Sequence, residues 1–332
     1  MSSFLPTTLF LIFGFFIKHF SSVLALFNNR AKGGSAKPLP APEKQAVDCP
    51  YEYILNIYGH HHFKKIIAFL DPNLEKNDPQ KHTLILDILD AVHFGAILVD
   101  DVADGSTLRK GQPAAHHIYG SAETVNRAYL VIYEATLKIQ QQRPEMMPFL
   151  TECVTQIHKG QDIALVWRRD GFELPYNVED ALKAYRHSAW LKTGALFMLV
   201  GQLITLSHDK DDLMSDYGWY CQLQNDCKNV FSSDVVSAKG ALAEDLINGE
   251  YSYPILVGLY AAKPVSKPIA DVFNRKDKSK SASNKALNRA CNALQSEEVR
   301  SVCLRELEEI RARNQQFSLL WGRSEKMKLS AN

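Results

Sequence analysis

The chain has 332 residues, with 38 Lys and Arg against 37 Asp and Glu, so its formal net charge is +1. Hydrophobic residues make up 46% and charged residues 23%, which is typical of a globular protein and excludes a disordered, collagen-like or multi-span membrane chain. The balanced charge argues against a nucleic-acid binder, which usually carries a basic excess or stripe. The six cysteines form no CxxC pair, which indicates free thiols in a reducing compartment such as the cytoplasm.

The first 27 residues are strongly apolar, but Lys18 interrupts them. A membrane-spanning helix needs roughly 20 largely apolar residues, a length that this segment reaches only by accommodating Lys18. We expect residues 1–27 to be a hydrophobic segment that anchors the protein to a membrane through residues 4–27. A dispensable start and a cleaved targeting segment are the alternatives. The protein is then expected to be cytoplasmic or to lie at the face of the endoplasmic reticulum.

The rest of the chain has a helical pattern. Residues 28–49 are rich in Pro, Ala, Gly and Lys, as in a flexible linker. From residue 50 onward apolar residues recur every three or four positions, and no alternating run is long enough to build a sheet. One all-α domain is therefore predicted over residues 50–325, followed by a tail over residues 326–332. Helices are predicted over residues 82–101, 122–142, 147–166, 178–205, 211–231 and 296–317, with Ser296 as the capping residue of the last.

Three carboxylates crowd into five positions after an apolar run: Asp100, Asp101 and Asp104. On a helix, Asp100 and Asp104 lie on one face, one turn apart. Half-buried like charges are tolerable when a cation lies between them, and oxygen ligands on one face suit Mg²⁺. Arg109 and Lys110 follow closely, and a diphosphate bridged by Mg²⁺ needs such cations to neutralise its remaining charge. An exposed acidic helix end is the alternative.

A second oxygen-bearing cluster lies far along the chain, over residues 222–229. Asn225 and Asn229 are again four positions apart, so they share a helix face. Two facing helices that each present metal ligands would form a diphosphate-binding site in the core of a helical bundle.

The segment from Leu89 to Asp104, continued by residues 106–120, resembles the first aspartate-rich region of the all-trans polyprenyl diphosphate synthases. Further similarities follow in order as far as residue 254, and together they are far more specific than the aspartates alone. They are Gly160-Gln161-Asp162 with Val166-Trp167-Arg168, then Lys192-Thr193-Gly194, the second cluster, and Glu244-Asp245-Leu246 with Gly249 and residues 251–254. The last of these is similar to a segment of eukaryotic geranylgeranyl diphosphate synthases.

This resemblance implies an all-α helical bundle of the isoprenoid synthase type with a central diphosphate and Mg²⁺ cavity. It also implies a homodimer and three Mg²⁺ ions per active site with diphosphate bound. Metal ions and cations stabilise the departing diphosphate, so that the allylic C–O bond ionises and a π-system attacks the carbocation. By position, it implies catalytic roles for Asp100, Asp101, Asp104, Arg109 and Lys192, allylic diphosphate binding by Arg109, Lys192, Thr193, Gln222 and Lys239, and metal binding by Asp100, Asp104, Asn225, Asp226 and Asn229.

The chain departs from the family where isopentenyl diphosphate binds. After the Pro-Tyr-x-Tyr-Ile segment, His60 stands in place of the family's Lys and Phe63 in place of its Arg. Lys110 replaces a second Arg after the first aspartate-rich motif, whereas His93 is retained. The expected acceptor-binding residues are therefore His60, His93 and Lys110, with fewer fixed positive charges than in the family.

Two further departures concern the second metal cluster and one more cation. Asn225 stands where the family has a carboxylate ligand, and an uncharged amide oxygen binds Mg²⁺ more weakly. Glu250 stands where the family has a Lys. In this family, small residues such as Gly95 and Ala96 before the first motif leave a long tunnel for the chain, which fits a C20 donor.

The predicted function is that of a Mg²⁺-dependent prenyltransferase (EC 2.5.1-like). It would transfer a geranylgeranyl group from geranylgeranyl diphosphate to a small-molecule acceptor, indole-3-glycerol phosphate, as fungal indole-diterpene relatives do in secondary metabolism. The first alternative is a geranylgeranyl diphosphate synthase that elongates with isopentenyl diphosphate. A class I terpene cyclase and a non-catalytic regulatory partner of a synthase are the further alternatives.

Overall fold

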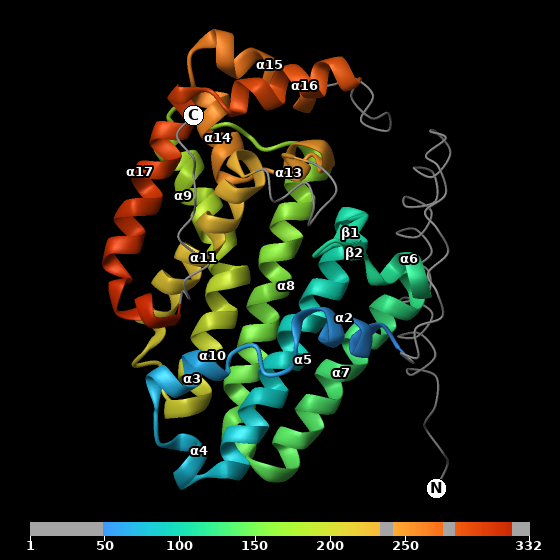
Figure 1. The fold of residues 1–332 in the computed structure, drawn as a ribbon, viewed down its shortest axis with the longest axis vertical. Helices are drawn as coiled ribbons and strands as arrows, with labels where there is room; N and C mark the ends of the chain where they lie inside the picture. Colours follow the sequence, from blue (N-terminus) through green and yellow to red (C-terminus); the bar gives the residue numbers. More distant parts are fainter. Residues whose placement is uncertain (1–48, 233–241, 275–282, 321–332) are drawn as a thin grey trace, which may run out of the picture. The chain divides into compact units, whose positions relative to one another are not determined.

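The computed structural model describes residues 49–232, 242–274 and 283–320, which have the all-α fold that was predicted (Figure 1). They also include one short hairpin that was not predicted. Lys239, the segments 1–27 and 28–48 and the tail 326–332 lie outside the described residues. The elements are α2 (Pro50–Tyr58), α3 (Lys64–Leu70), α4 (Leu74–Asn77), α5 (Pro79–Asp104), β1 (Leu108–Arg109), β2 (Gln112–Pro113), α6 (Ala115–Tyr119), α7 (Ser121–Gln142), η1 (Pro144–Met146), α8 (Met147–Asp170), α9 (Val178–Ala189), η2 (Trp190–Gly194), α10 (Ala195–Thr205), α11 (Asp211–Phe231), α13 (Glu244–Asn248), α14 (Tyr253–Tyr260), α15 (Lys263–Phe273), α16 (Asn284–Leu294), α17 (Glu297–Arg313) and η3 (Gln315–Leu320).

Helix α5 carries the three aspartates at its C-terminal end and packs along α7 (Figure 1). It begins at Pro79, where the Asp78 carboxylate accepts a hydrogen bond from the backbone N–H of Lys81 at 2.9 Å. Within the described residues it is the one helix long and apolar enough to cross a membrane, and most of that apolar stretch is buried inside the protein. A Cβ at Gly95 would lie 3.1 Å from Ile132 Cδ1 on α7. Gly95 therefore allows α5 and α7 to pack closely, and the long tunnel expected beside Gly95 and Ala96 stays a prediction.

The helix predicted over residues 178–205 is three elements, because the π-helix η2 separates α9 from α10. Two glycines on neighbouring helices allow this turn to approach them. A Cβ at Gly160 on α8 would lie 2.6 Å from Lys192 Cγ, and one at Gly218 on α11 would lie 3.0 Å from Gly194 Cα. Single π turns inside helices are frequent at functional sites, and this one carries Lys192 and Thr193.

The predicted helix over residues 296–317 is α17 followed by the short helix η3. Ser296 occupies the N-cap position as predicted, but its buried hydroxyl makes no capping hydrogen bond and has no partner among the described residues.

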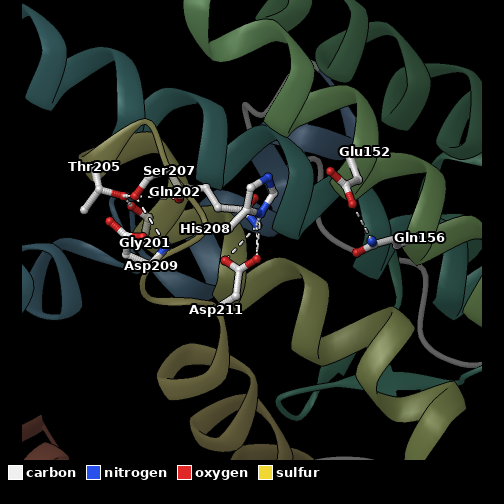
Figure 2. Close-up of polar contacts among 9 residues, drawn as sticks. All are labelled: Glu152, Gln156, Gly201, Gln202, Thr205, Ser207, His208, Asp209 and Asp211. Carbon is white, nitrogen blue, oxygen red and sulfur yellow. Dashed lines mark hydrogen bonds and ion pairs between the residues drawn. The ribbon is translucent and has the colours of Figure 1, made fainter.

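The connection between α10 and α11 is closed by polar contacts, which Figure 2 shows. The Gln202 amide donates to both carboxylate oxygens of Asp211 at 2.9 Å, and His208 Nδ1 lies 2.7 Å from Asp211 Oδ2. The hydrogen bond to Asp211 raises the pKa of His208. The Ser207 hydroxyl donates to Thr205 Oγ1 at 3.1 Å rather than to the histidine. These contacts therefore hold the loop and do not activate a serine.

Candidate active site

Hydrogen bonds between side chains of α5, α8 and η2 bring the first group of predicted residues together. The Asp100 side chain is 40% exposed, and its Oδ1 accepts a hydrogen bond from Gln161 Nε2 at 3.3 Å. Gln161 Oε1 in turn accepts one from Lys192 Nζ at 3.2 Å. Gln161 therefore links the predicted metal ligand Asp100 to the predicted diphosphate-binding Lys192.

Asp101 is fully buried and holds Arg109 in place. Its Oδ1 accepts a hydrogen bond from Arg109 Nε at 3.0 Å, and Arg109 Nη2 donates to the same oxygen. Burial raises the pKa of Asp101, and the adjacent guanidinium lowers it. Arg109 Nη2 also lies 4.0 Å from Asp100 Oδ2. Asp101 thus acts as a support for Arg109, which faces the exposed carboxylate of Asp100.

A tight turn positions the two cations after the aspartates. Strands β1 and β2 pair in antiparallel register, with Arg109 opposite Gln112. Lys110 and Gly111 between them both have positive φ, 50° and 78°, as a type I′ turn requires. This geometry places Arg109 and Lys110 on the same short hairpin next to the end of α5.

Asp104 is nearly buried and pairs with Arg168 of α8, whose Nη2 lies 2.7 Å from Asp104 Oδ1. Burial raises the pKa of Asp104 well above its usual range, and the nearby Asp100 and Glu250 raise it further. Arg168 and Lys192 oppose this shift. Three carboxyl groups with two basic groups therefore form a crowded centre in which a divalent cation would relieve repulsion.

The second cluster lies on α11 and joins the same network. The Thr193 hydroxyl donates to Gln222 Oε1 at 2.6 Å, and Gln222 Nε2 donates to Asp226 Oδ1 at 2.9 Å. Asp226 Oδ2 accepts from the Tyr185 hydroxyl and, at 3.1 Å, from the backbone N–H of Tyr253. Both oxygens of Asp226 thus accept hydrogen bonds from protein donors, which tie α11 to α9 and α14, and its expected role as a metal ligand stays a prediction.

The two asparagines of this cluster differ. Asn225 is exposed, whereas Asn229 is buried, and neither atom of its amide has a hydrogen-bond partner among the residues that the structure describes. Buried polar groups without a partner are rare and call for an explanation such as an ion or a water molecule.

These residues fit a divalent cation that is completed by substrate. Among the described residues, no three His, Cys, Asp or Glu side chains converge as a full metal group. Three groups here offer oxygen atoms, which suit Mg²⁺. They are the partly exposed carboxylate of Asp100, the carboxylate of Asp104 that is crowded by like charges, and the amide of Asn229. Mg²⁺ commonly takes few protein ligands and fills its octahedron with water and phosphate oxygens.

On the acceptor side, the structure brings His62 rather than His60 to His93. The rings of His62 and His93 stack with centroids 5.3 Å apart and an interplanar angle of 16°. His60 is exposed, and its ring neighbours that of His61. Lys110 Nζ lies 3.8 Å from the centroid of the Tyr58 ring, which also packs on both stacked imidazoles.

Phe63, where the family resemblance predicts an arginine, is 2% exposed. Its ring packs at right angles on His93 at 5.3 Å and on Phe197 at 5.8 Å. Burial lowers the pKa of His93 to about 3, and His62, Arg109 and Lys110 add to this effect. The acceptor side is therefore an aromatic and uncharged imidazole surface with Lys110 at its edge.

Several residues of this network were not among the predicted site residues. Gln161 and Arg168 lie in segments that carry the family resemblance, so the signal for them was present. Tyr185 carried no sequence signal, because its contact with Asp226 joins α9 to α11 across the fold. His62 was missed because His60 was matched by position, whereas the turn around His61, with φ of 60°, places His62 against His93.

Comparison with known proteins agrees with this description. The family model for polyprenyl synthetase matches residues 44–290. Prenyl transferase nodC of Hypoxylon pulicicidum is 44% identical over 302 residues, which is 91% of this chain and 90% of that protein. Prenyl transferase paxC of Penicillium paxilli is 40% identical over 285 residues, covering 86% and 87%. A crystal structure of a polyprenyl synthase from Caulobacter crescentus, complexed with calcium and isoprenyl diphosphate, has the same fold, with a TM-score of 0.65 at 18% identity, covering 90% of this chain and 88% of that one.

Proposed function

The chain belongs to the polyprenyl synthetase family, and from this membership we propose that it is a prenyltransferase that uses geranylgeranyl diphosphate and Mg²⁺ and prenylates an acceptor other than isopentenyl diphosphate. The proposed acceptor is indole-3-glycerol phosphate, and the proposed pathway is indole-diterpene biosynthesis. The similar proteins named prenyl transferase support the reaction class.

One observation carries the choice of acceptor: the two sides of the site differ in charge. Arg109, Arg168 and Lys192 surround the aspartates on the donor side. On the acceptor side, Phe63 and the stacked imidazole of His62 lie where the family resemblance predicts a segment with basic residues. A second diphosphate would lack cations there, whereas an aromatic molecule would find rings to pack against.

The residues of the donor side are suited to ionising an allylic diphosphate. Asp100, Asp104, Asp226 and the amides of Asn225 and Asn229 would hold Mg²⁺, which supplies charge that stabilises the departing diphosphate. Arg109, oriented by Asp101, and Lys192, oriented by Gln161, neutralise the remaining phosphate charge. Lys239 is proposed to do the same from the family resemblance alone.

The overall reaction balances without a further reactant. The allylic C–O bond breaks, and its electron pair leaves with the diphosphate. A carbon of the acceptor's π-system forms the new C–C bond, and the acceptor's aromatic system is restored when it releases an electrofuge, in the simplest case a proton.

The reaction is tested with the full chain and Mg²⁺. Geranylgeranyl diphosphate is supplied with and without indole-3-glycerol phosphate, and farnesyl diphosphate is supplied separately with isopentenyl diphosphate. We expect a prenylated indole as the product. Efficient elongation by isopentenyl diphosphate would instead identify a geranylgeranyl diphosphate synthase. A hydrocarbon from the donor alone would identify a cyclase, and no product would favour a regulatory partner.

The metal and diphosphate assignment is tested with Asp100→Ala. Removing this open carboxylate should lower kcat by at least about 100-fold, because Mg²⁺, which neutralises the leaving diphosphate, loses a ligand. Asp87→Ala is the matched control, since Asp87 lies on the same helix and forms a partly exposed ion pair with Lys138 at 3.0 Å. Undiminished turnover in Asp100→Ala would refute the assignment.

We also infer that two copies of the chain associate as a homodimer through α7. This helix exposes four large apolar side chains at helical spacing: Tyr129, Leu130, Tyr133 and Leu137. A contiguous exposed apolar stripe is typical of an interaction surface.

A further inference from the structure

We propose that His62 positions the acceptor: its imidazole, stacked on His93 beside Tyr58 and Lys110, is the platform on which a planar aromatic acceptor with one anionic group lies. The inference rests on the proposed prenyl transfer to an aromatic acceptor, and it adds the residue that selects this acceptor and the chemistry by which it does so.

The backbone that carries His62 is held by a buried carboxylate. Asp90 on α5 is 4% exposed and accepts hydrogen bonds from the backbone N–H groups of His61 at 2.7 Å and His62 at 3.3 Å. His61 adopts a φ of 60°, which is uncommon for a residue other than glycine. Two hydrogen bonds to one carboxylate thus stabilise a turn that would otherwise be disfavoured. They also fix the backbone position from which the His62 side chain extends.

The His62 ring packs against three other rings, yet the residue is exposed to solvent. It stacks on His93, and the rings of Tyr58 and Phe94 lie at steep angles to it with centroids at 6.1 and 6.4 Å. A ring that is held in this way on an exposed residue offers a surface on which a second flat ring can stack.

The charges around this platform fit one anionic group better than a diphosphate. Phe63 removes the cation that the family resemblance predicts, and Arg109 is bound to Asp101. Among the described residues, Lys110 is the cation that contacts these packed rings, because its ammonium group lies over the Tyr58 ring. A single ammonium group can neutralise much of a monophosphate, whereas a diphosphate needs several donors.

The surroundings of both imidazoles favour their uncharged form. Burial lowers the pKa of His93 to about 3, and burial together with Lys110 lowers the pKa of His62, although Asp90 opposes this. A neutral imidazole stacks on an aromatic ring and does not repel an allylic carbocation formed nearby, as an imidazolium would.

The test compares variants of His62 in the full chain with geranylgeranyl diphosphate and indole-3-glycerol phosphate. His62→Ala and His62→Leu should each raise the KM for the acceptor about tenfold, the loss expected for one stacking contact. The KM for the donor should change less than twofold. His62→Phe, which keeps a flat ring, should restore the acceptor KM to within about threefold of the unmodified chain. His187→Ala is the matched control, because His187 is an exposed histidine stacked on Trp190 at 6.2 Å and 12°.

Two results would overturn the inference: an unchanged acceptor KM in both His62→Ala and His62→Leu, or a larger increase in His60→Ala than in either. Equilibrium dialysis with labelled indole-3-glycerol phosphate separates this failure from that of the proposed function. If the unmodified chain neither binds nor prenylates this acceptor, the proposed function fails and the inference with it. If it does both and the His62 variants bind equally well, only the inference fails.

Discussion

At the residue scale, Glu250 places a carboxylate where the family resemblance predicts a lysine. Burial is the main reason that its pKa rises to about 7, and Asp245 and Asp100 raise it further. Arg168 and Lys192 lower it. The sequence alone could not show whether this side chain faces solvent or the diphosphate, and the structure places it among the charged groups of the donor side.

This shift predicts a pH dependence of stability in protein freed of metal by a chelator. Since the folded pKa lies above the ordinary value of 4.5, the folded chain holds more protons than the unfolded chain between pH 4.5 and 7. The free energy of unfolding therefore falls as pH rises through this range. Glu250→Gln removes the effect. The free energy of unfolding of this variant, relative to that of the unmodified chain, should therefore rise by about 1 to 3 kcal/mol from pH 5 to pH 8.

The measurement is urea unfolding of both chains at the two pH values. Glu309→Gln is the control, because Glu309 is an exposed carboxylate on α17. A stability difference between Glu250→Gln and the unmodified chain that stays constant with pH would contradict the prediction.

The residues that could be identified from the sequence are those whose chemistry depends on local spacing. Asp100 and Asp104 share a helix face because α5 is a regular helix to its end. Spacing could not reveal that Asp226 accepts hydrogen bonds from Tyr185 and Gln222, because the contact with Tyr185 depends on how α9 packs against α11. For the same reason, the buried and unpartnered amide of Asn229 became evident only in the structure.

At the element scale, η2 depends on two glycines, and its geometry predicts the effect of filling one of them. In Gly160→Ala, the new methyl group would lie 2.6 Å from Lys192 Cγ and 2.9 Å from Leu191 Cβ, closer than real contacts allow. We expect a loss of about 1 to 3 kcal/mol in the free energy of unfolding. The kcat should also fall, because Lys192 must move away from Gln161.

Urea unfolding and steady-state kinetics measure the two effects. The control is Gln156→Ala, about one turn earlier on α8, where the partly exposed side chain donates a hydrogen bond to Glu152 on the same helix (Figure 2). Its stability should stay within about 0.5 kcal/mol of the unmodified chain. If Gly160→Ala keeps full stability and full kcat, the glycine does not position η2.

Periodicity predicted the long helices well and the interruptions poorly. α11 spans Asp211–Phe231 as predicted, because it has regular apolar spacing and a polar loop before it. Trp190–Gly194 continues the apolar pattern of its neighbours, so the π turn has no local signature and arises from the approach of α8 and α11. The hairpin before α6 was missed because each of its strands has two residues, too few for an alternating pattern.

At the scale of the whole molecule, the exposed stripe on α7 predicts a change of oligomeric state. Tyr133 is 66% exposed and Leu137 is 55% exposed, one turn apart. Replacing both by glutamate places two charges in the proposed interface, where burying them without partners is costly. Sedimentation velocity should show a dimer for the unmodified chain and a monomer for Tyr133→Glu with Leu137→Glu.

The control places the same two charges at the same spacing elsewhere, as Ser301→Glu with Arg305→Glu on the exposed face of α17. That variant should remain a dimer. A monomeric unmodified chain, or a dimer that survives both α7 substitutions, would show that α7 is not the interface.

The N-terminal segment belongs to the same scale, because its proposed role is to place the catalytic domain at a membrane. The family match begins at residue 44, and the first described helix, α2, buries Tyr53 and Ile54 against the domain. Tyr53 also donates a hydrogen bond to the carbonyl of Pro113 at 2.7 Å, which secures α2 to the hairpin.

Removing residues 1–27 should therefore leave these contacts, the thermal unfolding midpoint and kcat unchanged. Binding to phospholipid vesicles, measured by sedimentation, should be lost, because transfer of the apolar side chains into lipid is its driving force. Equal vesicle binding by both chains would contradict an anchor, and a lower unfolding midpoint would show instead that the segment packs on the domain.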